Sequence, residues 1–121
     1  PWFIGQWQGR LLNIHPALLP AYRGLKTHER ALADGVKIHG CTVHFVVLAM
    51  DHGPIIAQAA VAVRDSDTPE TLAARVLAEE HAIYPAALAC VAEGRTRVQG
   101  NRVFCGDPAT ESAPLRVPFD G

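Results

Sequence analysis

The amino-acid sequence predicts an α/β domain, and three of its segments support that prediction. Residues 40–48 and 54–63 are rich in β-branched side chains and lie on either side of a short loop, which is typical of two antiparallel strands. Residues 68–94 begin with a Thr-Pro pair, have apolar side chains at helical spacing and end in glycine, which predicts a long amphipathic helix. A chain of 121 residues with 49% hydrophobic content fits one globular domain or a large part of one.

Two shorter elements are expected before these. Residues 10–15 form an apolar run followed at once by proline, and we expect them to be a buried parallel strand in the centre of the sheet. Residues 16–25 contain two prolines and a glycine, which predicts a rigid loop. Thr27 is expected to cap a short helix that runs to about Asp34 and is closed by Gly35.

The C-terminal third contains a helix breaker, a hairpin and an irregular end. Pro85 lies inside the long helix and is expected to kink it into two segments. Residues 96–104 have a Gly-Asn pair at their centre, which predicts a hairpin. Residues 105–121 are rich in Pro, Gly and Ser without periodicity. We therefore expect one folded unit, residues 1–104, and an irregular tail, residues 105–121.

Composition excludes several classes of function. Eleven basic and twelve acidic residues give a net charge of -1, so no electrostatic argument favours nucleic acid or a membrane surface as partner. No apolar run approaches the roughly 20 residues of a membrane helix. Cys41, Cys90 and Cys105 are far apart and form no CxxC pair, so a reducing cytoplasm is the simplest location. Small polar molecules remain the expected ligands.

The N-terminus suggests that another part of the protein packs there. The chain opens on proline rather than methionine, and its first residues include Trp2, Phe3, Ile4 and Trp7. That is more apolar surface than a free terminus normally has. We therefore expect a truncated or processed chain.

Asn13, His15 and Asp51 are the candidate catalytic residues. Asn13 and His15 are two residues apart, so a strand directs both side chains to the same face. An Asn amide can donate to a developing oxyanion, and a protonated His can do the same and exchange a proton. A nearby carboxylate such as Asp51 would favour the imidazolium. Taken singly, each residue is more often structural than catalytic.

A cluster of histidines makes a metal site the rival hypothesis. The cluster consists of His15, His28, His39, His44 and His52. None forms an HExxH or HxH pair, so we expect no metal site. His39 and His52 flank glycines and are expected to be solvent-exposed, whereas His44 is expected to be buried in a strand.

Four separated motifs resemble one enzyme family. They are NIHPALLPAYRG (13–24), HGCTVHFV (39–46), MDHGPIIAQ (50–58) and EEHAIYP (79–85). Their order and spacing resemble the phosphoribosylglycinamide formyltransferases. The methionyl-tRNA formyltransferases and formyltetrahydrofolate deformylases share Asn-x-His and the distant Asp, but the proline after His15 and the EEHAIYP segment favour the first family.

The resemblance implies the C-terminal part of a Rossmann-like formyltransferase fold, a mixed sheet with flanking helices. It implies transfer of a formyl group from 10-formyltetrahydrofolate to the amine of glycinamide ribonucleotide in de novo purine biosynthesis, without a metal. Asn13 and protonated His15 would hold the tetrahedral oxyanion, and Asp51 would keep His15 charged and help move the proton.

The resemblance also implies binding roles. Asn13 and the loop Val47, Leu48, Ala49, Met50 and Asp51 would bind the folate. Glu80 would hold the ribose hydroxyls of the nucleotide, and Thr42, His44 and His28 would support the site. Lys26 and Leu77 stand where relatives carry polar residues, so no role is given to them.

The family also has an N-terminal half with a phosphate-binding Gly-rich turn, and this chain lacks such a turn. We therefore expect the N-terminal half as a partner and little or no turnover from the chain alone. Homodimerisation is possible. Two alternatives stay open, namely a deformylase that hydrolyses the same folate and a non-catalytic folate-binding fragment.

Overall fold

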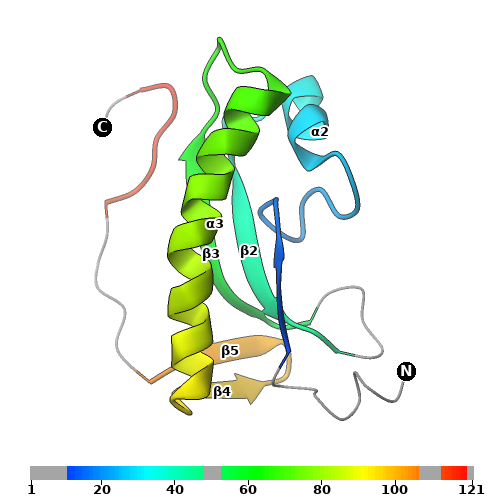
Figure 1. The fold of residues 1–121 in the computed structure, drawn as a ribbon. Coiled ribbons are helices and arrows are strands. Elements are labelled where there is room, and N and C mark those ends of the chain that lie inside the picture. The colour runs from blue at the N-terminus through cyan, green and yellow to red at the C-terminus, as the bar shows by residue number, and fades with distance from the viewer. Residues whose placement is uncertain (1–10, 48–52, 107–112, 120–121) are drawn as a thin grey trace.

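The computed structural model describes residues 11–47, 53–106 and 113–119, which form a mixed sheet with two helices against it (Figure 1). In chain order the elements are β1 (Leu12–His15), α2 (Thr27–Asp34), β2 (Ile38–Phe45), β3 (Ile55–Ala62), α3 (Pro69–Ala92), β4 (Thr96–Gln99) and β5 (Arg102–Cys105). The strand order is β1-β2-β3-β5-β4. The predicted α/β class, with a mixed sheet and flanking helices, is confirmed.

The direction of β1 differs from the prediction. β1 pairs antiparallel with β2 and lies at the edge of the described sheet, so the expectation of a parallel central strand was wrong. His15 at the end of β1 lies opposite Thr42 near the middle of β2, and the start of β1 lies opposite the end of β2. The loop and α2 therefore return the chain to the end of the sheet where β1 stopped, which forces the two strands to run in opposite directions. An apolar run does not itself encode this direction.

β2 and β3 pair antiparallel, as the sequence predicts, with a shift in register between Val43 and His44, and β3 continues the sheet through a parallel contact with β5. β4 and β5 form the predicted hairpin around residues 100–101. The predicted irregular tail begins one residue too early, because Cys105 belongs to β5, whereas residues 113–119 form no helix or strand.

α3 packs across the sheet and builds the core (Figure 1). Leu72 and Val76 of the helix are fully buried against Cys41 of β2, and Ile83 packs on the same cluster. The expected break at Pro85 was wrong, because α3 is one helix of 24 residues. Proline removes one backbone hydrogen bond. Burial of the flanking turns on the sheet, at Ile83 and at the 4% exposed Ala87, holds the helix together.

The two helices begin in different ways. Thr68 caps α3 as predicted, since its hydroxyl accepts from Thr71 N at 3.2 Å while Thr71 Oγ1 accepts from Thr68 N at 2.9 Å. The bounds predicted for α2 are confirmed, but its cap residue is Lys26, with φ +56°, rather than Thr27. Thr27 is buried and its hydroxyl donates to Pro16 O at 2.6 Å, so it fastens the preceding loop instead of the helix end.

Candidate active site

β1 presents Asn13 and His15 on one face of the sheet, as the spacing predicts. They lie opposite His44 and Thr42 of β2, and cross-strand partners share a face. Ile14, between them, points to the opposite face and packs on the core beneath α3. Asn13 is exposed and His15 is half-buried, so a side-chain amide and an imidazole lie together on an accessible edge strand of the described sheet.

A backbone carbonyl orients His15. Its Nε2 lies 2.8 Å from Tyr22 O. A carbonyl oxygen can only accept, so Nε2 carries the hydrogen and donates it. The proton that His15 gains or loses is therefore on Nδ1. Tyr22 adopts φ +51°, a left-handed conformation that is uncommon for a residue other than glycine and is often found at functional sites.

The loop of residues 16–26 is fastened to the sheet through Thr42. Thr42 Oγ1 donates to Ala17 O at 2.7 Å and accepts from Leu19 N at 3.0 Å. Gln58 of β3 adds a third bond, because its Nε2 donates to Thr42 Oγ1 at 2.9 Å. Thr42 thus fastens the loop that follows His15, while the role in the site expected of it stays a prediction. Gln58 was given no role from the sequence. A polar side chain in the otherwise apolar segment Pro54–Val63 was the available signal.

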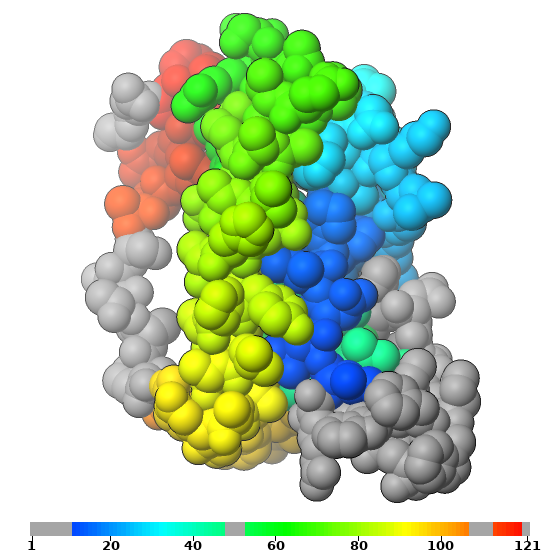
Figure 2. Space-filling view, viewed as in Figure 1, coloured from blue at the N-terminus to red at the C-terminus, as the bar shows by residue number. Residues whose placement is uncertain are grey.

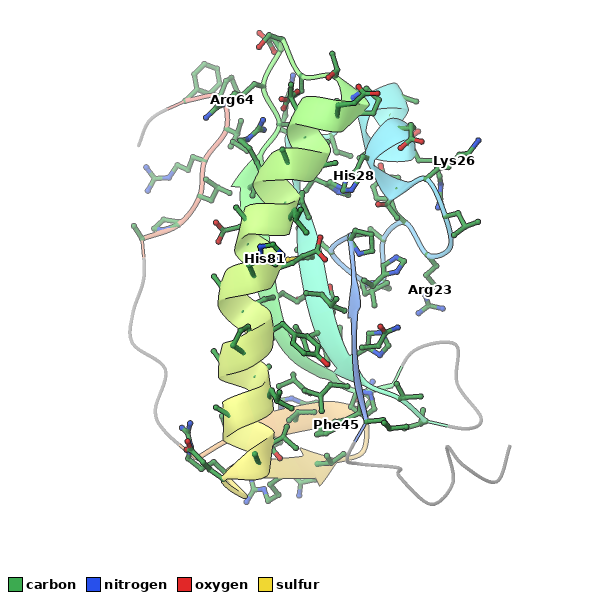
Figure 3. All side chains as sticks on the ribbon, in the orientation of Figure 1. Arg23, Lys26, His28, Phe45, Arg64 and His81 are labelled. Atoms are coloured by element: carbon green, nitrogen blue, oxygen red, sulfur yellow. The ribbon has the colours of Figure 1, made fainter. Side chains whose placement is uncertain are left out.

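His39 is buried, which corrects the expectation that it is solvent-exposed. It is 1% exposed, because it begins the buried stretch of β2 under the loop and α2. His28, labelled on α2 in Figure 3, contacts His39, with its Nδ1 3.2 Å from His39 Nε2. Burial, with the charges of His28 and His15, lowers the pKa of His39 to about 4. Burial also lowers the pKa of His28, against the raising influence of Glu29 and Glu80.

His44 is buried, as predicted, and its Nδ1 lies 2.9 Å from Phe45 O. It lies beside Asn13, its cross-strand partner, on the same face of the sheet. Within the described ranges, no three His, Cys, Asp or Glu side chains are grouped so that they could hold a metal ion.

A pocket of about 500 Å³ joins β1 to α3 and brings two predicted site residues together. Asn13 and Glu80 both line it. The other lining residues are Ile14, Leu77, His81, Tyr84 and Pro85. The seam between α3 and the segment around β1 is visible in Figure 2, and His81 lies on the outer side of α3 in Figure 3. His81 and Tyr84 were given no role from the sequence, although both fall within the EEHAIYP motif.

Of the residues predicted to form the folate loop, Val47 is the one that lies within the described part of the chain. Val47 is half-buried after the end of β2. Leu48, Ala49, Met50 and the catalytic candidate Asp51 lie outside the described residues, as does His52. The proximity of Asp51 to His15 therefore stays a prediction.

No helix in the described residues is long and apolar enough to span a membrane.

Comparison with known proteins assigns the chain to a family. A model of the formyl transferase family matches residues 1–88. The chain belongs to the formyl transferase family. The chain is 48% identical over 104 residues to the phosphoribosylglycinamide formyltransferase of Escherichia coli, a match covering 86% of the chain and 49% of the relative. It is 50% identical over 103 residues to the human trifunctional purine biosynthetic protein adenosine-3, covering 85% of the chain and 10% of that protein.

Comparison with solved structures finds the same kinds of enzyme. The glycinamide ribonucleotide transformylase 1 of Symbiobacterium toebii superposes with a TM-score of 0.78 at 56% identity, covering 82% of this chain and 47% of that one. A formyltetrahydrofolate deformylase from Pseudomonas syringae reaches a TM-score of 0.84 at 31% identity, covering 88% and 36%. The resemblance to phosphoribosylglycinamide formyltransferases is confirmed. The chain spans about half the length of the bacterial curated relatives it matches, and its assignment to their C-terminal part stays a prediction.

Proposed function

We propose that this formyl transferase, together with an N-terminal half of the kind found in its family, transfers the formyl group of 10-formyltetrahydrofolate to the amine of glycinamide ribonucleotide in purine biosynthesis. The observation that most supports the proposal is the shared pocket, in which Asn13 and Glu80 line one cavity although they are far apart in the sequence. One residue supplies an oxyanion donor and the other a carboxylate suited to a diol.

The chemistry proposed for the site is addition of the amine to the formyl carbon followed by elimination of the folate. The substrate amine attacks the formyl carbon, and its new C–N bond produces a tetrahedral oxyanion. The Asn13 amide donates to that oxygen, and His15, whose Nε2 hydrogen is directed at the Tyr22 carbonyl, acts through Nδ1. The bond from the formyl carbon to N10 of the folate then breaks, and the proton lost by the amine ends on N10.

Asp51 and the loop around it complete the proposal. Asp51 would stabilise the His15 imidazolium and relay the proton, since a carboxylate near an imidazole favours its charged form. The folate would lie along Asn13 and Val47, Leu48, Ala49, Met50 and Asp51. Glu80 would accept hydrogen bonds from the ribose hydroxyls, and the reaction uses no metal.

The N-terminal half is the proposed partner, and we expect the cytoplasm as the site of action. The match of this chain to about half of each bacterial relative supports a partner region. The described sheet also ends at β1, next to the pocket, where a further strand could be added. Residues 1–104 would form the catalytic and folate-binding part, and residues 105–121 a tail. Self-association into a homodimer is a further possibility.

The experiment measures formyl transfer by the chain alone and by the chain co-expressed with the N-terminal half of the Escherichia coli relative. We expect transfer from the pair and little or none from the chain alone. Asn13→Ala and His15→Ala, each in the pair, should lower kcat by at least about a hundredfold. Undiminished kcat in both variants would contradict the proposed roles.

A deformylase is the second candidate, since solved deformylases share the fold with TM-scores of 0.84 and 0.74. Their lower identity, 31% and 34%, favours the transferase. Release of free formate without formylated amine in the same assay would reverse this choice.

A further inference from the structure

His15, Thr42 and Gln58 occupy one row across three adjacent strands. His15 lies opposite Thr42, and Thr42 lies opposite Gln58. Directly opposed residues point to the same face of a sheet, so the three side chains are neighbours on the face that also presents Asn13. Gln58, on β3, is the member of this row farthest from His15, and the proposed mechanism gives it no role.

The Thr42 hydroxyl makes every hydrogen bond that it can make, and Gln58 donates one of them. The hydroxyl has one hydrogen, which goes to Ala17 O, and two lone pairs, which accept from Leu19 N and Gln58 Nε2. Gln58 Nε2 also donates to Leu19 O at 3.0 Å. Gln58 and Thr42 thus bind both sides of the Leu19 backbone, which fixes the start of the loop relative to the sheet.

The same loop returns to His15. After Leu19 it turns through Ala21, whose N–H donates to Leu18 O, and then presents the Tyr22 carbonyl to His15 Nε2. At its far end the Tyr22 hydroxyl donates to Asp34 of α2. The carbonyl that selects the His15 tautomer is therefore held between two anchors, the Gln58–Thr42 pair and the Tyr22–Asp34 contact.

We propose that Gln58 is a positioning residue for His15. Through Thr42 and Leu19 it fixes the loop of residues 16–26, so that the Tyr22 carbonyl holds the hydrogen on Nε2 of His15 and leaves Nδ1 as the nitrogen that exchanges its proton. The orientation of His15 is a property of this chain alone. Its importance for formyl transfer rests on the proposed function.

The position of Gln58 makes the proposal testable without unfolding the protein. Gln58 is solvent-exposed, whereas Thr42 is fully buried, so a substitution at Gln58 leaves the core intact. Gln58→Met keeps the length of the side chain and removes both donated hydrogen bonds. Gln58→Glu, studied above the titration range of a carboxyl, also cannot donate. Gln99→Met, at an exposed glutamine of β4, is the matched control.

The experiment records nitrogen-15 NMR of the histidine rings and amide hydrogen exchange on the whole 121-residue chain. In the unsubstituted chain, His15 should show hydrogen on Nε2. In both Gln58 variants that single pattern should become a mixture of tautomers, and the Leu19 amide should exchange about tenfold faster. The Gln99 control should match the unsubstituted chain.

An unchanged His15 pattern in the Gln58 variants would overturn the proposal, even if the Leu19 amide exchanges faster, because Gln58 would then only stabilise the loop. These measurements need no turnover, so they stand apart from the proposed function. In the pair with the N-terminal half, the Gln58 variants should lower kcat with little change in KM. An equal kcat would show that the positioning has no catalytic consequence.

Discussion

His28 and His39 share a hydrogen bond, with Nδ1 of the first 3.2 Å from Nε2 of the second and their rings nearly perpendicular at 89°. One imidazole must donate and the other must accept, so the pair cannot persist when both rings are fully protonated. The bond joins α2 to β2 beneath the loop of residues 16–26. Acid should therefore weaken the contact between α2 and β2, close to the loop that positions His15.

Stability should fall between pH 6.5 and pH 4. The pKa of His39 is lowered from 6.5 to about 4 in the folded protein, because burial and the neighbouring charges of His28 and His15 oppose protonation. As the pH falls, the unfolded chain binds the proton before the folded protein does. The stability that depends on neutral His39 is therefore fully present above about pH 6.5 and is lost as the pH falls toward 4. Urea unfolding at pH 7.5 and 4.5 should differ by up to about 3 kcal/mol from this residue.

His39→Gln should reduce that difference, because the variant has no imidazole to protonate at this position. His81→Gln, at an exposed position on α3, is the control and should keep the difference of the unsubstituted protein. An equal loss of stability with acid in His39→Gln would show that other groups determine the acid sensitivity.

The Asp67–Arg75 pair predicts a stabilising contact at the start of α3. Asp67 Oδ1 and Oδ2 accept from Arg75 at 2.6 and 2.7 Å, and Oδ2 accepts from Arg64 N at 2.8 Å. The hydrogen bonds from Arg75 hold the pKa of Asp67 well below its ordinary value of 3.8, although burial opposes this. Asp67→Asn should lower the free energy of unfolding at pH 7 by about 2 kcal/mol.

The pH dependence of that loss distinguishes charge from packing. A carboxylate with a lowered pKa stabilises the folded state above pH 3.8, and this contribution is lost as the pH falls below that value. The difference in free energy of unfolding between Asp67→Asn and the unsubstituted protein should therefore narrow in acid. Asp65→Asn, on the exposed loop before Asp67, should change stability by less than about 0.5 kcal/mol. A gap that stays constant with pH would contradict the ion-pair explanation.

Local signals in the sequence predicted most elements of the fold. Thr68-Pro69 and Gly94 marked the ends of α3, and the Gly100-Asn101 pair marked the β4–β5 turn, because caps and tight turns depend on nearby residues. The direction of β1 and the continuity of α3 through Pro85 were mispredicted. Both depend on packing between distant segments, which periodicity does not encode.

The candidate site could be proposed from the sequence where side-chain chemistry defines it. Asn13 and His15 were proposed from their spacing and Glu80 from the family resemblance, and their roles stay predictions. The Tyr22 carbonyl could not be found, because any residue has one and its use depends on the loop conformation. His39 was misjudged because it flanks Gly40 and lies just before the predicted strand of residues 40–48, whereas β2 begins at Ile38 and includes it.

Gly40 should tolerate no side chain. A Cβ at this position would lie 1.9 Å from Ala59 O on the paired strand, well inside any real contact distance. Gly40→Ala would therefore force β2 and β3 apart, and its free energy of unfolding should fall by about 3 kcal/mol. Gly106→Ala is the control, because its Cβ would meet Arg95 at an ordinary 3.6 Å. Denaturant unfolding measures both, and equal stability of the two variants would refute the steric explanation.

Glu80 should govern binding of the nucleotide and leave the chemistry of transfer largely intact. It lines the pocket with Asn13, and a carboxylate that accepts from two ribose hydroxyls makes charge-assisted hydrogen bonds that glutamine weakens. In the pair with the N-terminal half, Glu80→Gln should raise KM for glycinamide ribonucleotide by about tenfold or more, with a small effect on kcat and on KM for the folate.

Glu79 supplies the matched control for that measurement. It is the preceding residue on α3 and is similarly half-buried, but it is absent from the residues that line the pocket. Successive helical residues point about 100° apart. Glu79→Gln should therefore leave both KM values near those of the unsubstituted pair. If Glu79→Gln raises KM for the nucleotide as much as Glu80→Gln does, loss of negative charge on α3 explains the effect, and the ribose contact assigned to Glu80 is wrong.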